Sequence, residues 1–342
     1  MESTLDIKKL LSDLLNVYGH SGNEKKAGET AAQYLSKYAK TSTDAMGNIY
    51  ATLGDKNSQR HLLIDAHLDQ IGMIVTGITD DGFILFDKVG GVDRRVMLGH
   101  EVTVLAKQEE FFGVVCCMPP HLTEAADSKK LPKFDEMSID IGLTANQARE
   151  KISAGDRIAL NGKPEFILNN NIISCALDNR ASVAAIIYAL ELIKDKKLNI
   201  KITVLLSAQE ETGERGAIVG AYSTDATESI AMDVGFAYTP DAKREKCGDV
   251  GKGVMIGFAP VLSLSMTNTL LSLVKKEGID FQYDIMGDLT GTNADMISVS
   301  RGGVKSALIS VPLKYMHTSV EMVCIDDIIS TARLLSAYIT AW

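Results

Sequence analysis

The sequence predicts an α/β protein whose mostly parallel central sheet is flanked by helices and interrupted by an inserted β-rich block. Apolar runs typical of buried strands alternate with segments of helical periodicity at both ends of the chain. In the middle, short β-type segments are separated by Gly, Asp and polar turns. Strands that alternate with helices favour a parallel sheet covered on both faces. We therefore expect residues 1–72 and 165–342 to form one domain and residues 73–164 to form a second, inserted domain.

The first 72 residues are expected to contain two helices followed by two strands. Apolar positions recur at helical spacing over 5–17. Ser21 and Glu24 form the S-x-x-E pattern of a capping box, which predicts a second helix near 23–39. The apolar runs "NIYATLG" and "HLLIDAHL" are typical of strands.

The inserted block is expected to be built from strands. Its β-type segments are "MIVTGI", "GFILFDKV", "EVTVLAK" and "FFGVVCCM". The polar stretch "DSKKLPKFDEM", residues 127–137, suits an exposed loop, and Thr144 with Gln147 predicts the start of one short helix. Strand edges left unpaired in such a block would favour association between copies.

The C-terminal part returns to alternating strands and helices. The predicted strands are 201–208, 229–235 and 305–312, and the predicted helices are 182–194, 267–278 and 325–340.

Composition excludes several classes of function. The chain has 342 residues, 46% of them hydrophobic and 23% charged, which is typical of a globular protein with a sizeable core. The net charge of -9 disfavours electrostatic binding of nucleic acid. The polar N-terminus does not resemble a signal peptide, and no uncharged apolar run reaches membrane-spanning length. The five cysteines form neither a CxxC motif nor a zinc pattern, so we expect a reduced, cytoplasmic protein.

Histidines and acids gather where the predicted strands of the α/β part end. They are His67, Asp69, Asp178, Glu210, Glu211, Asp233 and His317. Ligands of open α/β sheets bind outside the carboxyl ends of the strands, so these side chains are expected to share one edge. Imidazole and carboxylate together suit zinc, cobalt or manganese. One metal needs about three or four protein ligands. The larger set therefore predicts a pair of divalent ions that share a bridging carboxylate.

Each of these residues alone has an ordinary explanation. Asp178 would serve as the N-cap of the next helix, and Asp233 would suit a turn. Glu210 and Glu211 would be solvated loop acids, and His317 would be a surface or core histidine. Their joint occurrence at strand ends favours a site, because buried charges are costly unless they are paired or metal-bound. The other histidines fit no such cluster and are interpreted as structural or exposed: His20, His61, His100 and His121.

Five motifs, in order along the chain, resemble the di-metal aminopeptidases of metallopeptidase family 42. They are "AHLDQIG", "ALDNR", "AQEETGERGA", "AMDVG" and "KYMHTSVE". The resemblance also covers "YGHSGNE", "DAMGNIYA", "MPPH" and "GTNADMISVSRGG", and so runs over nearly the whole chain. This family comprises the TET-type peptidases, which are called glutamyl or leucyl aminopeptidases and sometimes endoglucanases.

The resemblance implies a zinc-peptidase-like fold and a role for each site residue. His67 and Asp233 would hold one metal, Glu211 and His317 would hold the other, and Asp178 would bridge them. The catalytic residues would be Glu210, as general base, and Asp69, which would orient His67. The activity implied is removal of the N-terminal residue from short peptides. The inserted block would be a PDZ-like or barrel dimerisation domain of a homo-oligomer, from a dimer to a tetrahedral dodecamer.

Two other enzyme classes compete with this interpretation. A glycosidase would use paired carboxylates such as Glu210 and Asp178, but it would leave both histidines without a purpose. A related di-metal deacylase of N-acyl amino acids would use the same metal ligands, so the residues alone do not exclude it.

Three positions depart from the family pattern. The family usually has Glu at the position of Gln70, often Asp at Asn293, and Pro at Lys305. We interpret them as neutral surface changes. The alternative is that they make the substrate pocket less acidic, so that it accepts acidic N-terminal residues.

Overall fold

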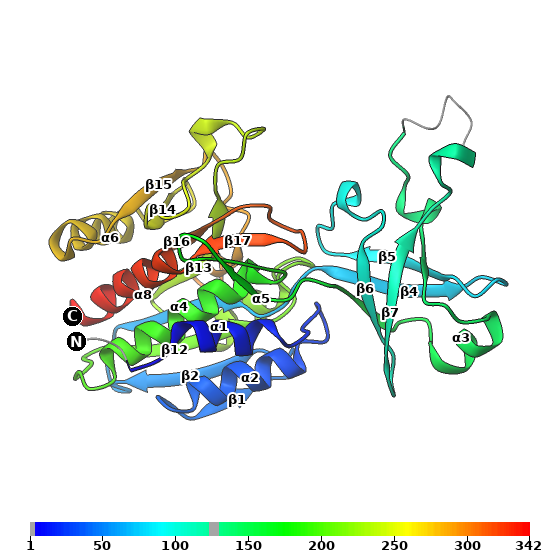
Figure 1. The fold of residues 1–342 in the computed structure, drawn as a ribbon. Coiled ribbons are helices and arrows are strands. Elements are labelled where there is room, and N and C mark those ends of the chain that lie inside the picture. The colour runs from blue at the N-terminus through cyan, green and yellow to red at the C-terminus, as the bar shows by residue number, and fades with distance from the viewer. Residues whose placement is uncertain (1–3, 123–129) are drawn as a thin grey trace. The chain divides into compact units, whose positions relative to one another are not determined.

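The computed structural model describes residues 4–122 and 130–342, and the chain divides into two compact units (Figure 1). The first unit comprises Met1–Gln70, Lys163–Met316 and Val320–Trp342. The second comprises Ile71–Gly162 and the short segment His317–Ser319. The loop predicted over 127–137 falls partly on residues 127–129, which lie outside the described residues.

An eight-stranded sheet forms the centre of the first unit (Figure 1). Its order is β1-β2-β12-β3-β13-β16-β14-β15. The bounds are β1 Thr41–Thr43, β2 Ile49–Gly54, β3 His61–His67, β12 Lys201–Ser207, β13 Glu228–Phe236, β14 Val254–Phe258, β15 Phe281–Ile285 and β16 Lys305–Leu313. The four central strands β12, β3, β13 and β16 are parallel, so their carboxyl ends meet at one edge. Antiparallel pairs join β1 to β2, β2 to β12 and β14 to β16.

Helices cover both faces of this sheet. They are α1 Ile7–Leu15, α2 Lys25–Leu35, α4 Leu177–Ile193, α5 Arg215–Ser223, α6 Leu264–Glu277, α7 Asn293–Ser298 and α8 Ile325–Thr340. Alternate residues of β3 pack on opposite faces of the sheet. Leu62 and Ile64 belong to the large core with α1, α4 and α8, whereas Leu63 packs in the smaller core with Ala217 of α5 and Ile297 of α7. This alternation is the two-residue period of a strand buried on both sides.

A small antiparallel sheet and one short helix complete the first unit. The sheet consists of β10 Glu165–Ile167, β11 Asn171–Ser174 and β17 Glu321–Cys324. The 3₁₀ helix is η4 Arg244–Lys246.

The second unit is a closed barrel of six antiparallel strands in the order β4-β5-β8-β7-β6-β9. Its elements are β4 Gly72–Ile78, β5 Ile84–Val89, β6 Glu101–Leu105, β7 Glu110–Cys116, β8 Ser138–Asp140, β9 Arg157–Leu160, α3 Ala145–Lys151 and the 3₁₀ helices η1 Arg94–Val96, η2 Pro120–Leu122 and η3 Phe134–Glu136. The capping box predicted at Thr144 and Gln147 is confirmed at the start of α3. Closure pairs the strand edges within the barrel, so the expected unpaired edges are wrong here.

The capping box predicted at Ser21 and Glu24 is wrong. Helix α2 begins at Lys25, but Glu24 makes no capping bond with its side chain. The Ser21 hydroxyl instead donates to Asp69 Oδ2 at 2.6 Å. The Glu24 carboxylate accepts hydrogen bonds from the Gly22 and Gln209 amides at 2.7 and 3.1 Å. Both polar side chains therefore serve tertiary contacts, which an S-x-x-E pattern cannot distinguish from a cap.

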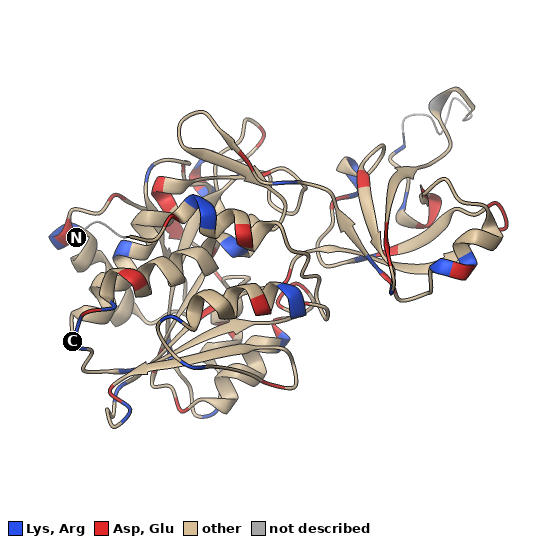
Figure 2. Ribbon diagram, turned by 60° about the horizontal axis from the view of Figure 1, so that its bottom comes forward, with Lys and Arg blue, Asp and Glu red and all other residues tan. Residues whose placement is uncertain are grey.

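Charge is dispersed over the molecule. Basic and acidic residues are interspersed along the helices and loops of both units (Figure 2). None of the helices in the described part of the chain is both long and apolar enough to cross a bilayer.

Candidate metal centre

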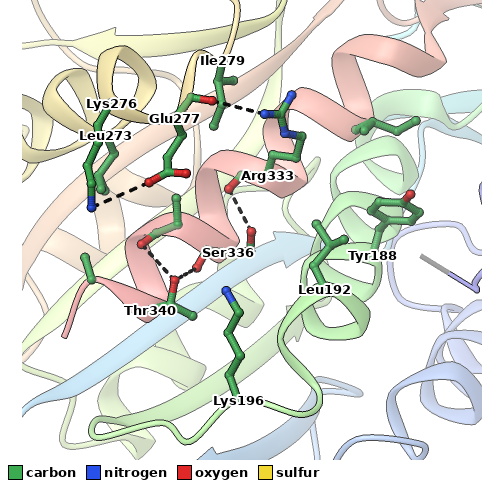
Figure 3. A pocket seen from close by; sticks show the side chains of 13 residues that line it. Tyr188, Leu192, Lys196, Leu273, Lys276, Glu277, Ile279, Arg333, Ser336 and Thr340 are labelled. Carbon is green, nitrogen blue, oxygen red and sulfur yellow. Dashed lines mark hydrogen bonds and ion pairs between the residues drawn. The ribbon is translucent and has the colours of Figure 1, made fainter. Parts of the chain in front are cut away.

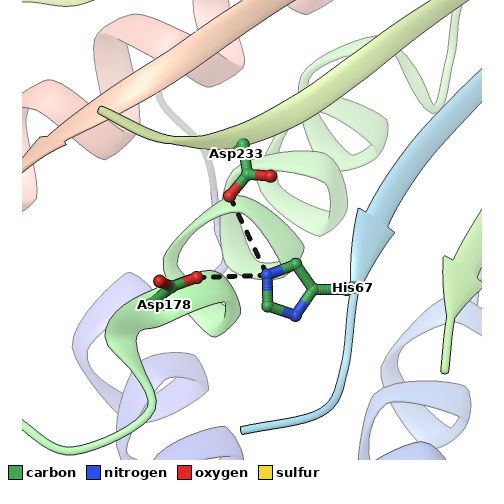
Figure 4. A group of neighbouring side chains, drawn as sticks. All are labelled: His67, Asp178 and Asp233. Atoms are coloured by element: carbon green, nitrogen blue, oxygen red, sulfur yellow. Dashed lines mark hydrogen bonds and ion pairs between the residues drawn. The ribbon is translucent and has the colours of Figure 1, made fainter. Parts of the chain in front are cut away.

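His67, the last residue of β3, is surrounded by carboxylates. Its Nε2 lies 3.1 Å from Asp178 Oδ1 and 3.8 Å from Asp233 Oδ1 (Figure 4). Glu210 Oε2 lies 3.9 Å from the same nitrogen. The His67 side chain is only 2% exposed, so these charges meet in an environment that screens them weakly.

Asp178 lies in the first turn of α4, where the backbone leaves the helical region. Its ψ is 103°, Ala176 has a φ of 61°, and the Asp178–Asn179 peptide bond is cis. The Asp178 carboxylate points toward His67 (Figure 4), and its Oδ1 lies within hydrogen-bond distance of His67 Nε2. Its backbone amide donates to Glu321 Oε2 at 3.1 Å, which helps to fix this turn.

Asp233 lies within β13, as the predicted strand 229–235 implies, and the strand continues to Phe236. The first turn of α4 holds the backbone on both sides of it. Asn179 Nδ2 donates to the Met232 carbonyl at 2.8 Å, and the Ser182 hydroxyl donates to the Asp233 carbonyl at 2.9 Å. These bonds couple the segment that carries Asp178 to the strand that carries Asp233.

The Glu210–Glu211 pair lies in a loop after β12 whose backbone turns sharply. Gln209 and Glu214 have φ values of 58° and 54°, and Gly213 has a φ of 109°. Gly213 permits this turn, because a φ of this size is strained for any residue with a Cβ. Gly216 is required for a different reason. A Cβ there would lie 2.2 Å from the Ala208 carbonyl oxygen.

Asp69 is fully buried and connects His67 to this loop. Its Oδ1 lies 3.5 Å from His67 Nδ1 and accepts a hydrogen bond from the Glu210 amide at 2.9 Å. Its Oδ2 accepts from the Glu211 amide at 3.2 Å and from the Ser21 hydroxyl at 2.6 Å. The Asp69 main-chain carbonyl is closer to His67 Nδ1, at 3.1 Å. Both oxygens favour a proton on Nδ1, which leaves Nε2 free to bind a metal.

Crowding of these charges shifts their pKa values strongly. Burial raises the pKa of Glu210, and the charges of Asp233 and Glu211 raise it further. Burial, followed by the charge of Asp178, raises the pKa of Asp233 in the same way. Burial opposes protonation of His67, but the negative charges around it, Glu210 first, raise its pKa well above the ordinary value. The cluster therefore binds protons when no cation offsets its negative charge.

The donor atoms fit a divalent cation. One ligand atom from each of His67, Asp178 and Asp233 lies within 4.8 Å of the others, and the same holds for His67, Glu210 and Glu211. Imidazole and carboxylate oxygen are the donors that zinc, cobalt and manganese accept. A bound cation would also offset the negative charge of the clustered carboxylates, as bound protons do without it.

His317, the remaining predicted ligand, follows β16 and belongs to the segment grouped with the second unit. Its backbone has a φ of 62°, and its Nδ1 lies 3.2 Å from the Gly91 carbonyl oxygen. That contact favours a proton on Nδ1, as in His67.

Two positions that depart from the family pattern are buried, so their interpretation as surface changes is wrong. Gln70 Oε1 accepts from the Arg180 guanidinium at 2.8 Å, and burial lowers the pKa of Arg180 to about 10. Asn293 Nδ2 donates to Asp65 Oδ2 at 2.7 Å. Lys305 is exposed at the first residue of β16, the end away from the candidate ligands. The three residues therefore do not line one pocket.

A cavity of about 680 Å³ lies between the C-terminal turns of α4 and α6 and one side of α8 (Figure 3). Lys196, Lys276 and Arg333 line it, and none of the candidate ligands does. Basic side chains near helix C-termini complement the negative end of the helix dipole, so their presence needs no bound anion.

The chain is similar to aminopeptidases over most of its length. The family model described as M42 glutamyl aminopeptidase matches residues 47–334. A lysyl aminopeptidase of Pyrococcus furiosus is 31% identical over 86% of this chain and 85% of its own. A TET aminopeptidase of a marine-sediment thaumarchaeon superposes with a TM-score of 0.93 at 26% identity, over 97% of this chain and 95% of its own. Pyrococcus horikoshii TET1, a peptidase described as assembling into a tetrahedron or a large octahedral shell, gives a TM-score of 0.85 at 28% identity, covering 98% and 99%.

The family match covers far more than half of the chain and includes every candidate ligand. The chain therefore belongs to the M42 glutamyl aminopeptidase family, a family of metallopeptidases.

Proposed function

We propose that this protein is a metal-dependent aminopeptidase that removes the N-terminal residue of short peptides. The convergence of His67, Asp178 and Asp233 within 4.8 Å carries the proposal, since a buried cluster of this kind requires a cation or protons. Family membership gives the reaction class.

Two divalent ions would account for the full donor set. His67 and Asp233 would hold one, Glu211 and His317 would hold the other, and Asp178 would bridge them. Zinc and cobalt suit these donors best, and manganese is a third candidate. When bound, such ions lower the pKa of water toward neutrality and polarise a carbonyl oxygen.

Glu210 would move the proton. Its carboxylate lies beside His67 without being needed as a terminal ligand. It would take a proton from the attacking water and return it to the leaving amine, serving first as base and then as acid. Asp69 would keep the proton of His67 on Nδ1 and would hold the loop that carries Glu210.

A substrate panel combined with metal analysis tests the proposal. We expect two metal ions per active chain, loss of activity with a chelator, and recovery on adding zinc, cobalt or manganese. Activity should require a free α-amine, so Leu anilide should be cleaved and its N-acetyl derivative should not. Release of acetate from N-acetyl-leucine without cleavage of Leu anilide would establish the deacylase, and chelator-insensitive cleavage of a glucan would establish the glycosidase. Lys, Glu and Leu anilides side by side would define the preferred residue.

A further inference from the structure

Four consecutive backbone amides of the Glu210–Glu211 loop are each held by a side chain from outside the loop. The Ala208 amide donates to Asn48 Oδ1 at 2.9 Å, and the Gln209 amide donates to Glu24 Oε1 at 3.1 Å. The amides of Glu210 and Glu211 both donate to the Asp69 carboxylate. Backbone groups in a loop of this kind would otherwise bond to water or to one another. The loop conformation is thus imposed by three buried side chains from the N-terminal 70 residues.

Glu24 binds the loop directly before Glu210, the proposed proton carrier. Its amide partner is Gln209, which precedes Glu210 directly and has a left-handed φ of 58°. A residue with a Cβ occupies this region only when its surroundings enforce it. Glu24 is 5% exposed, and the same oxygen also binds the Gly22 amide at 2.7 Å, which fixes the carboxylate in place.

We propose that Glu24 is a positioning residue that sets the Glu210 carboxylate at its working place through the Gln209 amide. This inference rests on the proposed peptidase function and assigns a role outside the ligand set. Catalytic groups must be held to within a fraction of an ångström, and a displacement near 1 Å costs about 100-fold in rate. Loss of the Glu24 contact should therefore lower kcat while leaving the metals and the binding of substrate in place.

Three substitutions at Glu24 separate the effect of the position of its accepting oxygen from the effect of its negative charge. Glu24→Gln keeps an accepting oxygen at the same distance and loses the charge. Glu24→Asp keeps the charge and withdraws the oxygen by one methylene. Glu24→Ala removes both. We expect kcat to fall about 10- to 100-fold in Glu24→Ala and in Glu24→Asp, with KM within about threefold of the wild type and two metals retained. Glu24→Gln should recover at least about tenfold of the loss in Glu24→Ala.

Asp327 provides a matched structural control. It is 1% exposed, and its carboxylate accepts hydrogen bonds from the Gly251 and Gly253 amides at 2.6 and 2.7 Å. It thus fixes a loop as Glu24 does, in α8 and without contact to a candidate ligand. Asp327→Ala should lose stability comparable to Glu24→Ala and keep kcat within about twofold.

The outcomes distinguish this inference from the proposed function. If the wild-type protein does not cleave aminoacyl substrates, the proposed function fails. If it does, and Glu24→Ala and Glu24→Asp retain wild-type kcat, the positioning role is wrong while the function stands. Should Glu24→Ala not fold, the comparison of Glu24→Gln with Glu24→Asp decides alone, since equal kcat in these two would refute the role.

Discussion

Two neighbouring acids, Glu210 and Glu211, have different proposed roles in this site. The amides of both residues donate to the same Asp69 carboxylate, so Asp69 fixes the backbone from which both side chains extend. Their proposed tasks differ, one being proton transfer and the other metal binding. Substitution should therefore affect them in different ways.

We predict that Glu210→Gln keeps both metals and lowers kcat by about 1,000-fold or more, because an amide cannot accept the proton of the attacking water. Glu211→Gln should instead lose roughly one metal per chain, because a neutral amide oxygen is a weaker ligand than a carboxylate. Elemental analysis of the purified variants, paired with single-substrate kinetics, checks both. If both variants keep two metals and full activity, Glu210 and Glu211 are ordinary loop acids.

At the scale of elements, the parallel strands explain why residues far apart in sequence meet. The strands β12, β3 and β13 run side by side in one direction, so their last residues share an edge. Helix α4 then adds Asp178 from its distorted first turn. Asp327 near the start of α8 instead holds a loop, through the Gly251 and Gly253 amides.

We predict that Asp327 makes stability depend on pH. Burial raises the pKa of its carboxyl from 3.8 to about 6 in the folded protein. The folded state then binds the proton more tightly than the unfolded state. This contribution is fully present below about pH 4 and is lost as the pH rises through 6, by at most roughly 3 kcal/mol.

Asp327→Asn removes this titration. Urea unfolding at pH 4.5 and pH 7 should show that the wild type loses more free energy of unfolding between the two values than the variant does. An equal change in both proteins would mean that Asp327 does not titrate in this window.

For the whole molecule, association between copies remains a proposal, and the barrel suggests how it would occur. The barrel is closed, so association through strand pairing is unfavourable there. Its outer surface exposes large apolar side chains instead, among them Phe112 at 58% and Met118 at 64%. Contiguous patches of exposed apolar side chains, rather than single ones, mark surfaces that a partner covers, so these residues would contribute to an interface only as parts of such a patch.

We expect the purified protein to form a homo-oligomer, a dimer or a larger closed assembly. Twelve chains of 37.0 kDa would give a mass near 440 kDa. Light scattering coupled to size-exclusion chromatography, with activity assayed across the peak, measures this directly. Full activity in a species near 37 kDa would refute the proposed assembly.

The long elements were accessible from sequence because they contain enough residues to show a period. Helices α1, α4, α6 and α8 and strands β3, β12, β13 and β16 all follow from apolar spacing. The patterns do not predict α7 or short strands such as β10, β11, β14, β15 and β17, because segments of this length rarely reveal their period. Helix α5 is as long as α1, but its buried face consists of Gly and Ala while Ile218 and Val219 are exposed, so its large apolar residues do not mark the buried face. The supporting residues Asn48, Asn179, Arg180, Ser182 and Glu321 carry no distinguishing pattern either, since their partners lie far away along the chain.

The α/β class, the β-rich insertion and the candidate ligands are predictable from sequence, because apolar periodicity and polar residues near strand ends are local properties. The partners of buried polar groups appear only in the folded chain: Ser21 and Glu24 bind Asp69 and the Gln209 amide, and Gln70 is buried against Arg180. The physical reason is that a buried polar group must find a partner. Which partner it finds depends on how distant segments pack together.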